Sequence, residues 1–343
     1  MRKLLNTLYV TTQGAYLNKE GETVCVNVDR EVRLRVPIHT VGAIVCFGNV
    51  SCSPFLMGFC GERNVGLCFL SENGHFLARV EGPVSGNVLL RREQYRRADD
   101  EKSCVVMARA CVIGKLSNAR TVLLRAIRDH QGKPGMETVG KVAEYLKHHI
   151  EALERQDNLE SIRGLEGDAA NAYFGVFDSL IIAQKDSFFF HERSRRPPKD
   201  NVNALLSFLY TLLVHDVVSA LESVGLDPAV GFLHKDRPGR PSLALDIMEE
   251  LRPLLADRLA LSLINLQQIT GKGFKTTESG GVMMSDETRK KVIVAYQERK
   301  KEEIMHPYIE EKVEIGLLPF VQALLLARHI RGDMDGYPPF FWK

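Results

Sequence analysis

Cysteine is scarce in this sequence and absent from most of it. Seven cysteines occur among 343 residues, and none lies beyond residue 111. Their number is odd, and no two have the Cys-x-x-Cys spacing. Zinc clusters and thiol catalysis are therefore excluded from the C-terminal two-thirds of the chain, and such an unpaired set is typical of a reducing compartment.

Long hydrophobic runs are also lacking. No uninterrupted stretch of about 18 apolar residues occurs, so the sequence predicts no transmembrane helix. The first residues do not continue into the apolar region of a signal peptide, because Asn6, Thr7 and Thr11 interrupt it. We therefore expect a cytoplasmic protein without a membrane partner.

The sequence has little net charge of either sign. It holds 45 basic and 43 acidic residues, a formal net charge of +2. Overall charge therefore does not indicate a nucleic-acid-binding protein, and any such role must come from local clusters. The 45% hydrophobic and 26% charged composition is ordinary for globular proteins and excludes disorder over most of the chain.

Hydrophobic patterning changes character along the chain. Up to about residue 85, short runs of β-forming residues alternate with turn residues, with a short helix expected at 53–63. From residue 89 onward, apolar residues recur at three- and four-residue steps. Helices are predicted at 104–130, 136–150, 159–184, 201–224, 243–269 and 285–303. Pro253 lacks a backbone amide and is expected to kink the helix at 243–269.

These patterns predict an α+β fold of two domains. A small, β-sandwich-like domain is expected over residues 1–87. Residues 88–100 are interpreted as a linker and the start of the first long helix. A larger all-α domain is expected over residues 101–343.

Glu166 is the first candidate for a functional carboxylate. Because helical positions advance by about 100° per residue, Glu166 shares a face with Ala169, Ala170 and Tyr173. A charged group on that small, apolar face is costly to bury without a partner. The alternative is that Glu166 lies in the first turn of its helix and accepts hydrogen bonds from free backbone amides.

A second group of candidates follows about 70 residues later. His234 ends an apolar run, and Asp246 and Glu249 lie three residues apart on one helix face. Each also has a purely structural interpretation. His234 can be a histidine at a helix end, and Asp246 and Glu249 can belong to a solvated acidic face. Together with Glu166 they form a set of one imidazole and two or three carboxylates, which favours Mg²⁺ or Mn²⁺ over zinc. Such an ion can polarise a phosphodiester and orient an attacking hydroxyl group.

Basic residues border both segments that supply these acids. Arginine suits two-pronged contacts with phosphate, although a basic run is usually only a solvated surface. Their position next to the candidate ligands favours an enzyme that acts on a polyanion. The candidate DNA-binding residues are Arg193, Arg195, Arg196, Lys235, Arg237 and Arg240.

Four motifs occur in order along the chain. They are GLEGDAA at 164–170, RRPPKDNVNALL at 195–206, GLDP with GFLH between 225 and 234, and SLALDIMEE at 242–250. Together they resemble the integrase and endonuclease subunit of CRISPR adaptation, which implies dimerisation through residues 1–87 and catalysis and DNA binding by residues 101–343. The resemblance covers nearly the whole chain and is closest to the subtype I-C branch. It implies a metal-dependent DNA endonuclease and integrase of spacer acquisition, in which a 3′-hydroxyl of a captured DNA fragment attacks a phosphodiester of the CRISPR array.

The resemblance also implies partners and site residues. The partners are double-stranded and branched DNA, a second copy of the chain, and a small ferredoxin-like protein whose dimer joins two such homodimers. Carried over by motif, the catalytic metal ligands are Glu166, His234 and Glu249, with Asp246, Asn203 and Tyr173 in supporting positions. Many relatives have Asp where this chain has Glu249, so Asp246 stays open as the third ligand. On the residues alone, a general metal-dependent nuclease and a non-catalytic DNA-binding scaffold remain alternatives.

Overall fold

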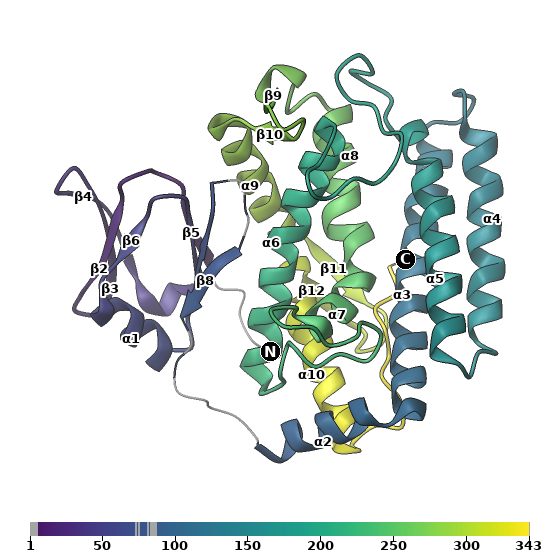
Figure 1. The fold of residues 1–343 in the computed structure, drawn as a ribbon, viewed down its shortest axis with the longest axis horizontal. Helices are drawn as coiled ribbons and strands as arrows, with labels where there is room; N and C mark the ends of the chain where they lie inside the picture. Colours follow the sequence, from purple (N-terminus) through teal and green to yellow (C-terminus); the bar gives the residue numbers. More distant parts are fainter. Residues whose placement is uncertain (1–5, 73, 75, 81, 83–87, 343) are drawn as a thin grey trace. The chain divides into compact units, whose positions relative to one another are not determined.

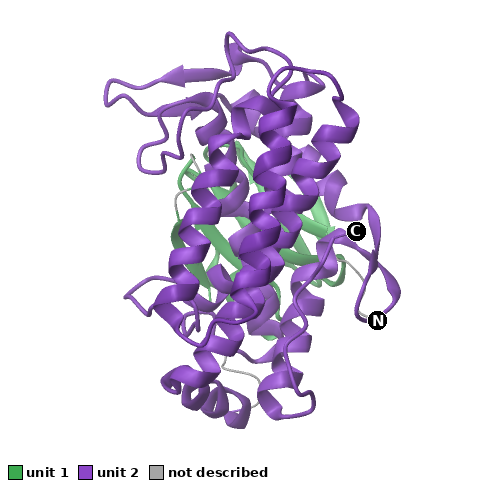
Figure 2. Ribbon diagram, turned by 90° about the vertical axis from the view of Figure 1, so that its right-hand side faces the viewer, with its two compact units in different colours: residues 1–86 green, residues 87–343 purple. Residues whose placement is uncertain are grey.

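The computed structural model describes residues 6–72, 74, 76–80, 82 and 88–342. The chain forms two compact units, residues 1–86 and residues 87–343 (Figure 2). All seven cysteines are free thiols. The first unit is built from β-strands and the second mainly from helices (Figure 1). The predicted α+β class is therefore confirmed.

The N-terminal unit contains two four-stranded sheets. The first has the order β1 (Asn6–Val10), β5 (Val41–Phe47), β7 (Gly66–Leu70) and β8 (Phe76–Val80). The second has the order β4 (Glu31–Pro37), β3 (Thr23–Val28), β2 (Tyr16–Glu20) and β6 (Ser51–Cys52). In the first sheet β1, β5 and β7 run parallel, and β8 is antiparallel to β7.

One apolar core joins both sheets and a helix. Leu17 and Val24 come from one sheet, Ile44 and Leu67 from the other, and Leu56 from helix α1 (Pro54–Glu62). The hydroxyl of Ser53 caps this helix, because it accepts a hydrogen bond of 3.2 Å from the amide of Leu56. The predicted sandwich-like arrangement and the helix at 53–63 are thus confirmed.

The second unit is predominantly helical. Its longer helices are α2 (Val88–Asp99), α3 (Glu101–Asp129), α4 (Met136–Leu153), α5 (Leu159–Gly175), α6 (Asn201–Val224), α7 (Ser242–Arg252), α8 (Arg258–Asn265), α9 (Asp286–Lys301) and α10 (Leu318–Arg331). Helix α3 packs against α4, α5 and α7, and α6 packs against α7 and α10. These contacts bring α3, α5 and α7 together, although they are far apart in the sequence.

Three predicted details of this unit are wrong, and one helix was missed. Two short hairpins, β9 (Phe274–Thr276) with β10 (Val282–Met284) and β11 (Glu303–His306) with β12 (Glu311–Glu314), depart from an all-α domain. Residues 88–99 form a separate helix, because Asp100 caps the start of α3 through the amide of Ser103 at 2.9 Å. Helix α10 was not anticipated. The helix expected to reach residue 184 ends at Gly175 and is followed by a 3₁₀ turn, Phe177–Leu180.

Proline interrupts the helix predicted at 243–269. A π-helical turn, Pro253–Asp257, separates α7 from α8, which confirms the expected disruption. Helix α8 ends at Asn265, where the side-chain Nδ2 donates to the carbonyl of Leu180 at 2.9 Å. The sequence therefore located the break but overestimated the length of the second half.

Helix α6 forms the centre of this unit. Asp200 caps its start through the amide of Asn203 at 2.7 Å, and Gly225 ends it with a φ of +89°. Within the described part of the chain, it is the one helix long and apolar enough to cross a membrane. Most of its apolar window is buried against α7 and α10, as in the core helix of a globular domain.

Candidate active site

Helix α5 presents Glu166 to its neighbour α3. Asn158 caps α5 by accepting a hydrogen bond of 3.0 Å from the amide of Ser161. Glu166 lies about two turns beyond this start, where every backbone amide already has a helical partner. The interpretation of Glu166 as a first-turn residue is therefore wrong. Its carboxylate instead contacts the ammonium group of Lys115 on α3.

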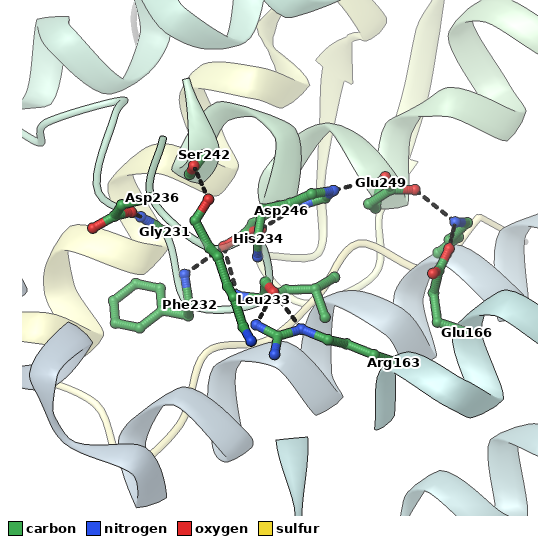
Figure 3. Close-up of polar contacts among 12 residues, drawn as sticks. Arg163, Glu166, Gly231, Phe232, Leu233, His234, Asp236, Ser242, Asp246 and Glu249 are labelled. Carbon is green, nitrogen blue, oxygen red and sulfur yellow. Dashed lines mark hydrogen bonds and ion pairs between the residues drawn. The ribbon is translucent and has the colours of Figure 1, made fainter. Parts of the chain in front are cut away.

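His234 lies in the loop between α6 and α7, and Asp246 holds this loop in place. Oδ2 of Asp246 accepts the amides of Phe232 and Leu233 at 2.6 and 3.0 Å. Oδ1 accepts the amide of His234 at 3.0 Å and its Nδ1 at 2.7 Å (Figure 3). A Cβ atom at Gly231 would lie 2.9 Å from Oδ2 of Asp246, so only glycine permits this close approach.

These contacts fix the orientation of the imidazole. Because Asp246 holds Nδ1, Nε2 of His234 is the ring nitrogen that remains to bind a metal ion. This Nε2 lies 4.0 Å from Oε1 of Glu249 on α7. A histidine whose Nδ1 is bound to a carboxylate and whose Nε2 faces another carboxylate is typical of metal centres.

Glu249 is buried among positive charges. Its Oε1 lies 2.6 Å from NH1 of Arg252, and its Oε2 lies 2.9 Å from Nζ of Lys115. Burial acts to raise the pKa of Glu249, but Arg252, Lys115 and His234 outweigh it and lower the pKa to about 2. Burial likewise acts to lower the pKa of Lys115, yet Glu249 and Glu166 raise it overall. Lys115 therefore bridges the carboxylates of Glu166 and Glu249.

The donor types in this site fit a hard divalent cation. One imidazole nitrogen and oxygens from two carboxylates are the mixed set that Mg²⁺ and Mn²⁺ accept. Two ligands of one ion, each about 2.1 Å from it, lie about 3–4 Å apart, and His234 and Glu249 satisfy this spacing. Within the described residues, however, no three His, Cys, Asp or Glu side chains already surround a single point. Lys115 lies between Glu166 and Glu249 instead.

Tyr173 and Asn203, the two other supporting candidates, belong to different hydrogen-bond networks. The hydroxyl of Tyr173 donates to Oδ2 of the buried Asp257 at 3.1 Å, and Tyr210 donates to Oδ1 at 2.6 Å. The guanidinium carbon of Arg252 lies 5.0 Å from the ring centroid of Tyr210. Because Arg252 also pairs with Glu249, it connects this network to the candidate metal ligands. Asn203 is fully buried, and its Oδ1 accepts NH1 of Arg193 at 2.6 Å.

The basic candidates fall into two groups. Arg193 is held inside the unit, since its guanidinium donates to Asn203 and, at 3.1 Å, to the hydroxyl of Ser207. The remaining candidates lie at the surface. Arg195, Arg196, Lys235 and Arg237 are exposed, and Arg240 is half-buried.

Sequence reasoning missed several residues of the site. Lys115 shares the α3 face of Cys104, Ala108, Cys111 and Asn118, which are buried. A single lysine on such a face is a detectable signal of a buried ion pair. No comparable pattern points to Arg163, which fixes the loop by donating to the carbonyl of Leu233 at 2.6 and 3.0 Å (Figure 3).

Solved structures of other proteins share the fold of this chain. A casposase bound to its integration product shares the fold, with a TM-score of 0.84 at 20% identity over 99% of this chain and 95% of that chain. A CAS1 protein from Thermotoga maritima has a TM-score of 0.80 at 26% identity, covering 95% of this chain and 97% of that chain.

Curated relatives match over the full length. The chain is 57% identical to CRISPR-associated endonuclease Cas1 1 of Chlorobaculum tepidum and 53% identical to CRISPR-associated endonuclease Cas1 2 of Rhodospirillum rubrum, with 100% of both chains covered in each case. Residues 8–298 match the family described as CRISPR associated protein Cas1. The resemblance read from the four motifs is thus confirmed at the level of the family, and this chain belongs to the Cas1 family.

Proposed function

We propose that Glu166, His234 and Glu249 bind one Mg²⁺ or Mn²⁺ ion, which the protein uses to cut and join DNA. As a member of the Cas1 family, the chain is an endonuclease and integrase of CRISPR adaptation. The observation that carries the metal assignment is the paired orientation of His234, with Nδ1 on Asp246 and Nε2 toward Glu249. When bound, the ion would act as a Lewis acid on the phosphodiester.

The contacts of Asp246 support Glu249 as the third ligand. Both oxygens of Asp246 already accept two hydrogen bonds each, three of them from backbone amides. If Asp246 bound the metal ion instead, its hydrogen bonds to the loop that carries His234 would be lost. Asp246 therefore acts as a positioning residue for His234, and Glu249 turns its carboxylate toward Nε2.

Exposed cations next to the site would bind the DNA backbone. Arg195 and Arg196 precede α6, and Lys235 and Arg237 follow His234 directly. Guanidinium groups at these positions suit bidentate contacts with phosphate. Arg193 and Asn203 are assigned to a different task, which is to tie the segment before α6 to the helix.

Assembly is the second part of the proposal. The chain would form a homodimer through its N-terminal unit, and two dimers would join a small ferredoxin-like partner dimer. A structure named Cas6-RT-Cas1–Cas2 complex shares the fold, at 22% identity. We place the protein in the subtype I-C branch and in the cytoplasm.

Integration is tested with a DNA donor that has free 3′-hydroxyl ends and a supercoiled acceptor carrying a CRISPR array. The proposed enzyme joins donor to acceptor in the presence of Mn²⁺, and a donor with 3′-dideoxy ends is not joined. A general nuclease would cut the acceptor without joining, and a scaffold would bind DNA without cutting it. Joining that persists with dideoxy ends would contradict the 3′-hydroxyl mechanism.

A further inference from the structure

Lys115 occupies a position that the assigned ligands do not explain. Its Nζ contacts Oε1 of Glu166 and lies 2.9 Å from Oε2 of Glu249. The three residues come from α3, α5 and α7, so the ammonium group joins three helices. It lies between two of the three proposed ligands.

This contact is shielded from water. The side chain of Lys115 is 15% exposed, that of Glu249 4% and that of Glu166 27%. Ion pairs in such surroundings are stronger than surface pairs, because solvent does not screen them and an unpaired partner would remain buried. The interaction is therefore difficult to break unless another cation replaces the ammonium group.

We propose that Lys115 competes with the divalent ion for Glu166 and Glu249, and thereby sets the metal affinity of the site. The inference rests on the metal site proposed above. An ion shared by the two carboxylates must lie about 2.1 Å from an oxygen of each, in the space where the ammonium group now bridges them. Two cations do not share that space, so metal binding requires Lys115 to withdraw on its flexible side chain.

The charge balance supports the same conclusion. Glu166 and Glu249 carry two negative charges, and Lys115 and Arg252 carry two positive charges. The charge of Lys115 therefore offsets the attraction that the two carboxylates would exert on a divalent ion. The protein therefore binds metal more weakly than its three ligands alone would allow.

Arg252 provides an internal comparison. It also pairs with Glu249, but through Oε1, and its guanidinium is held over the ring of Tyr210. Both Lys115→Met and Arg252→Met remove one positive charge beside Glu249. Only the first also clears the position between the two carboxylates.

The experiment measures Mn²⁺ binding to the full chain without DNA, using the electron paramagnetic resonance signal of the free ion. The variants are Lys115→Met, Arg252→Met and Glu166→Ala, with Lys141→Met on the surface of α4 as the matched control. We expect Lys115→Met to bind Mn²⁺ about tenfold more tightly than wild type, the size of a typical coupling between two ligands. Lys141→Met should bind Mn²⁺ with the affinity of wild type. The gain in Mn²⁺ affinity in Arg252→Met should be clearly smaller than in Lys115→Met.

A second readout guards against a variant that is merely unstable. Lys115→Met should melt at a lower temperature than wild type in EDTA, because two buried carboxylates lose a partner, and Mn²⁺ should raise its melting temperature by more than that of wild type. Lys115→Gln also removes the charge but keeps a polar, somewhat shorter side chain, and it should likewise bind Mn²⁺ more tightly than wild type.

The outcomes separate the two proposals. If wild type binds no more Mn²⁺ than Glu166→Ala, the proposed metal site itself fails. If wild type binds Mn²⁺ through Glu166 but Lys115→Met binds with equal or lower affinity, only the competition is wrong. An equal gain in Arg252→Met would also overturn it, because general charge removal would then explain the effect.

Discussion

Nδ1 of His234 lies 2.7 Å from Oδ1 of Asp246, and the same carboxylate accepts three backbone amides from residues 232–234. Asp246 thus joins the loop to the histidine and sets the orientation of its ring, in a loop that has no regular structure at His234. The two residues act as one unit in the proposed metal site.

Replacing Asp246 should therefore weaken metal binding without removing a ligand. We expect Asp246→Asn to lower Mn²⁺ affinity about 10–100-fold, the usual cost of losing a carboxylate that orients a metal-binding histidine. The measurement is Mn²⁺ titration of the variant. Asp236→Asn is the matched control, since Asp236 is exposed on the same loop and makes one long hydrogen bond of 3.4 Å to Gly231. Equal loss in both variants would contradict the positioning role.

Asp257 should make stability depend on pH. Burial raises its pKa to about 6, even though hydrogen bonds from Tyr210 and Tyr173 act to lower it. The folded state then retains a proton that the unfolded chain releases from about pH 4 upward. The free energy of unfolding therefore falls as pH rises from 4 to 6, by up to about 3 kcal/mol from this group.

The test compares wild type with Asp257→Asn in urea unfolding at pH 4 and pH 7. Because the variant cannot ionise at this position, its stability relative to wild type should be higher at pH 7 than at pH 4. Other titrating groups cancel in this difference. Parallel pH profiles for the two proteins would show that Asp257 does not titrate in this range.

Asn118 on α3 should be essential for holding the C-terminal residues Phe340 and Trp342 against the helices. Its Nδ2 donates to the carbonyls of Glu250 and Phe340 at 2.7 and 2.8 Å, and its Oδ1 accepts the amide of Trp342 at 2.7 Å. Asn118→Ala leaves buried backbone groups without partners, so we expect a loss of about 2–3 kcal/mol in unfolding free energy. Asn171→Ala, at an exposed position of α5, should change stability by less than about 0.5 kcal/mol. Similar losses in both would contradict this assignment.

The exposed arginines should affect DNA binding rather than stability. The double variant Arg195→Ala, Arg237→Ala should bind DNA more weakly. The slope of log affinity against log salt concentration should also become shallower, by about 0.9 for each phosphate that is no longer neutralised. Arg193→Ala should instead lower the melting temperature, because its guanidinium holds Asn203 and Ser207. Affinities measured at several salt concentrations, with melting curves, distinguish the two groups. An unchanged salt dependence in the double variant would remove Arg195 and Arg237 from the DNA-binding surface.

Elements whose ends are marked by capping residues and glycine could be predicted from the sequence. Helix α6 has the predicted limits, because Asp200 and Gly225 mark its ends and its apolar residues keep a helical period. The helix predicted to residue 184 ends at Gly175, where the tertiary contacts of the following 3₁₀ turn prevail over helical periodicity. The hairpins β9–β10 and β11–β12 have strands of three and four residues, too short for a clear alternating pattern.

In the site, too, contacts between residues close in sequence could be predicted, and contacts that depend on helix packing could not. Asp246 and Glu249 could be placed on one helix face from their spacing, and their closeness to His234 follows from a short loop. Lys115 could not be connected to Glu166 and Glu249 in this way, because the contact depends on how α3 packs against α5 and α7. Tyr210 and Asp257 were missed for the same reason, since they meet only through the packing of α6.

The proposed function depends above all on Glu166 as a ligand of a catalytic metal ion. The most direct measurement is the cleavage of linear and branched DNA by wild type and Glu166→Ala in Mn²⁺, Mg²⁺ or EDTA, with DNA binding and melting temperature measured alongside. We predict that wild type cuts only with a divalent ion, and that the variant binds DNA and folds normally but does not cut. Cleavage by the variant at the rate of wild type would contradict the metal site and favour a role for these acids in the fold alone.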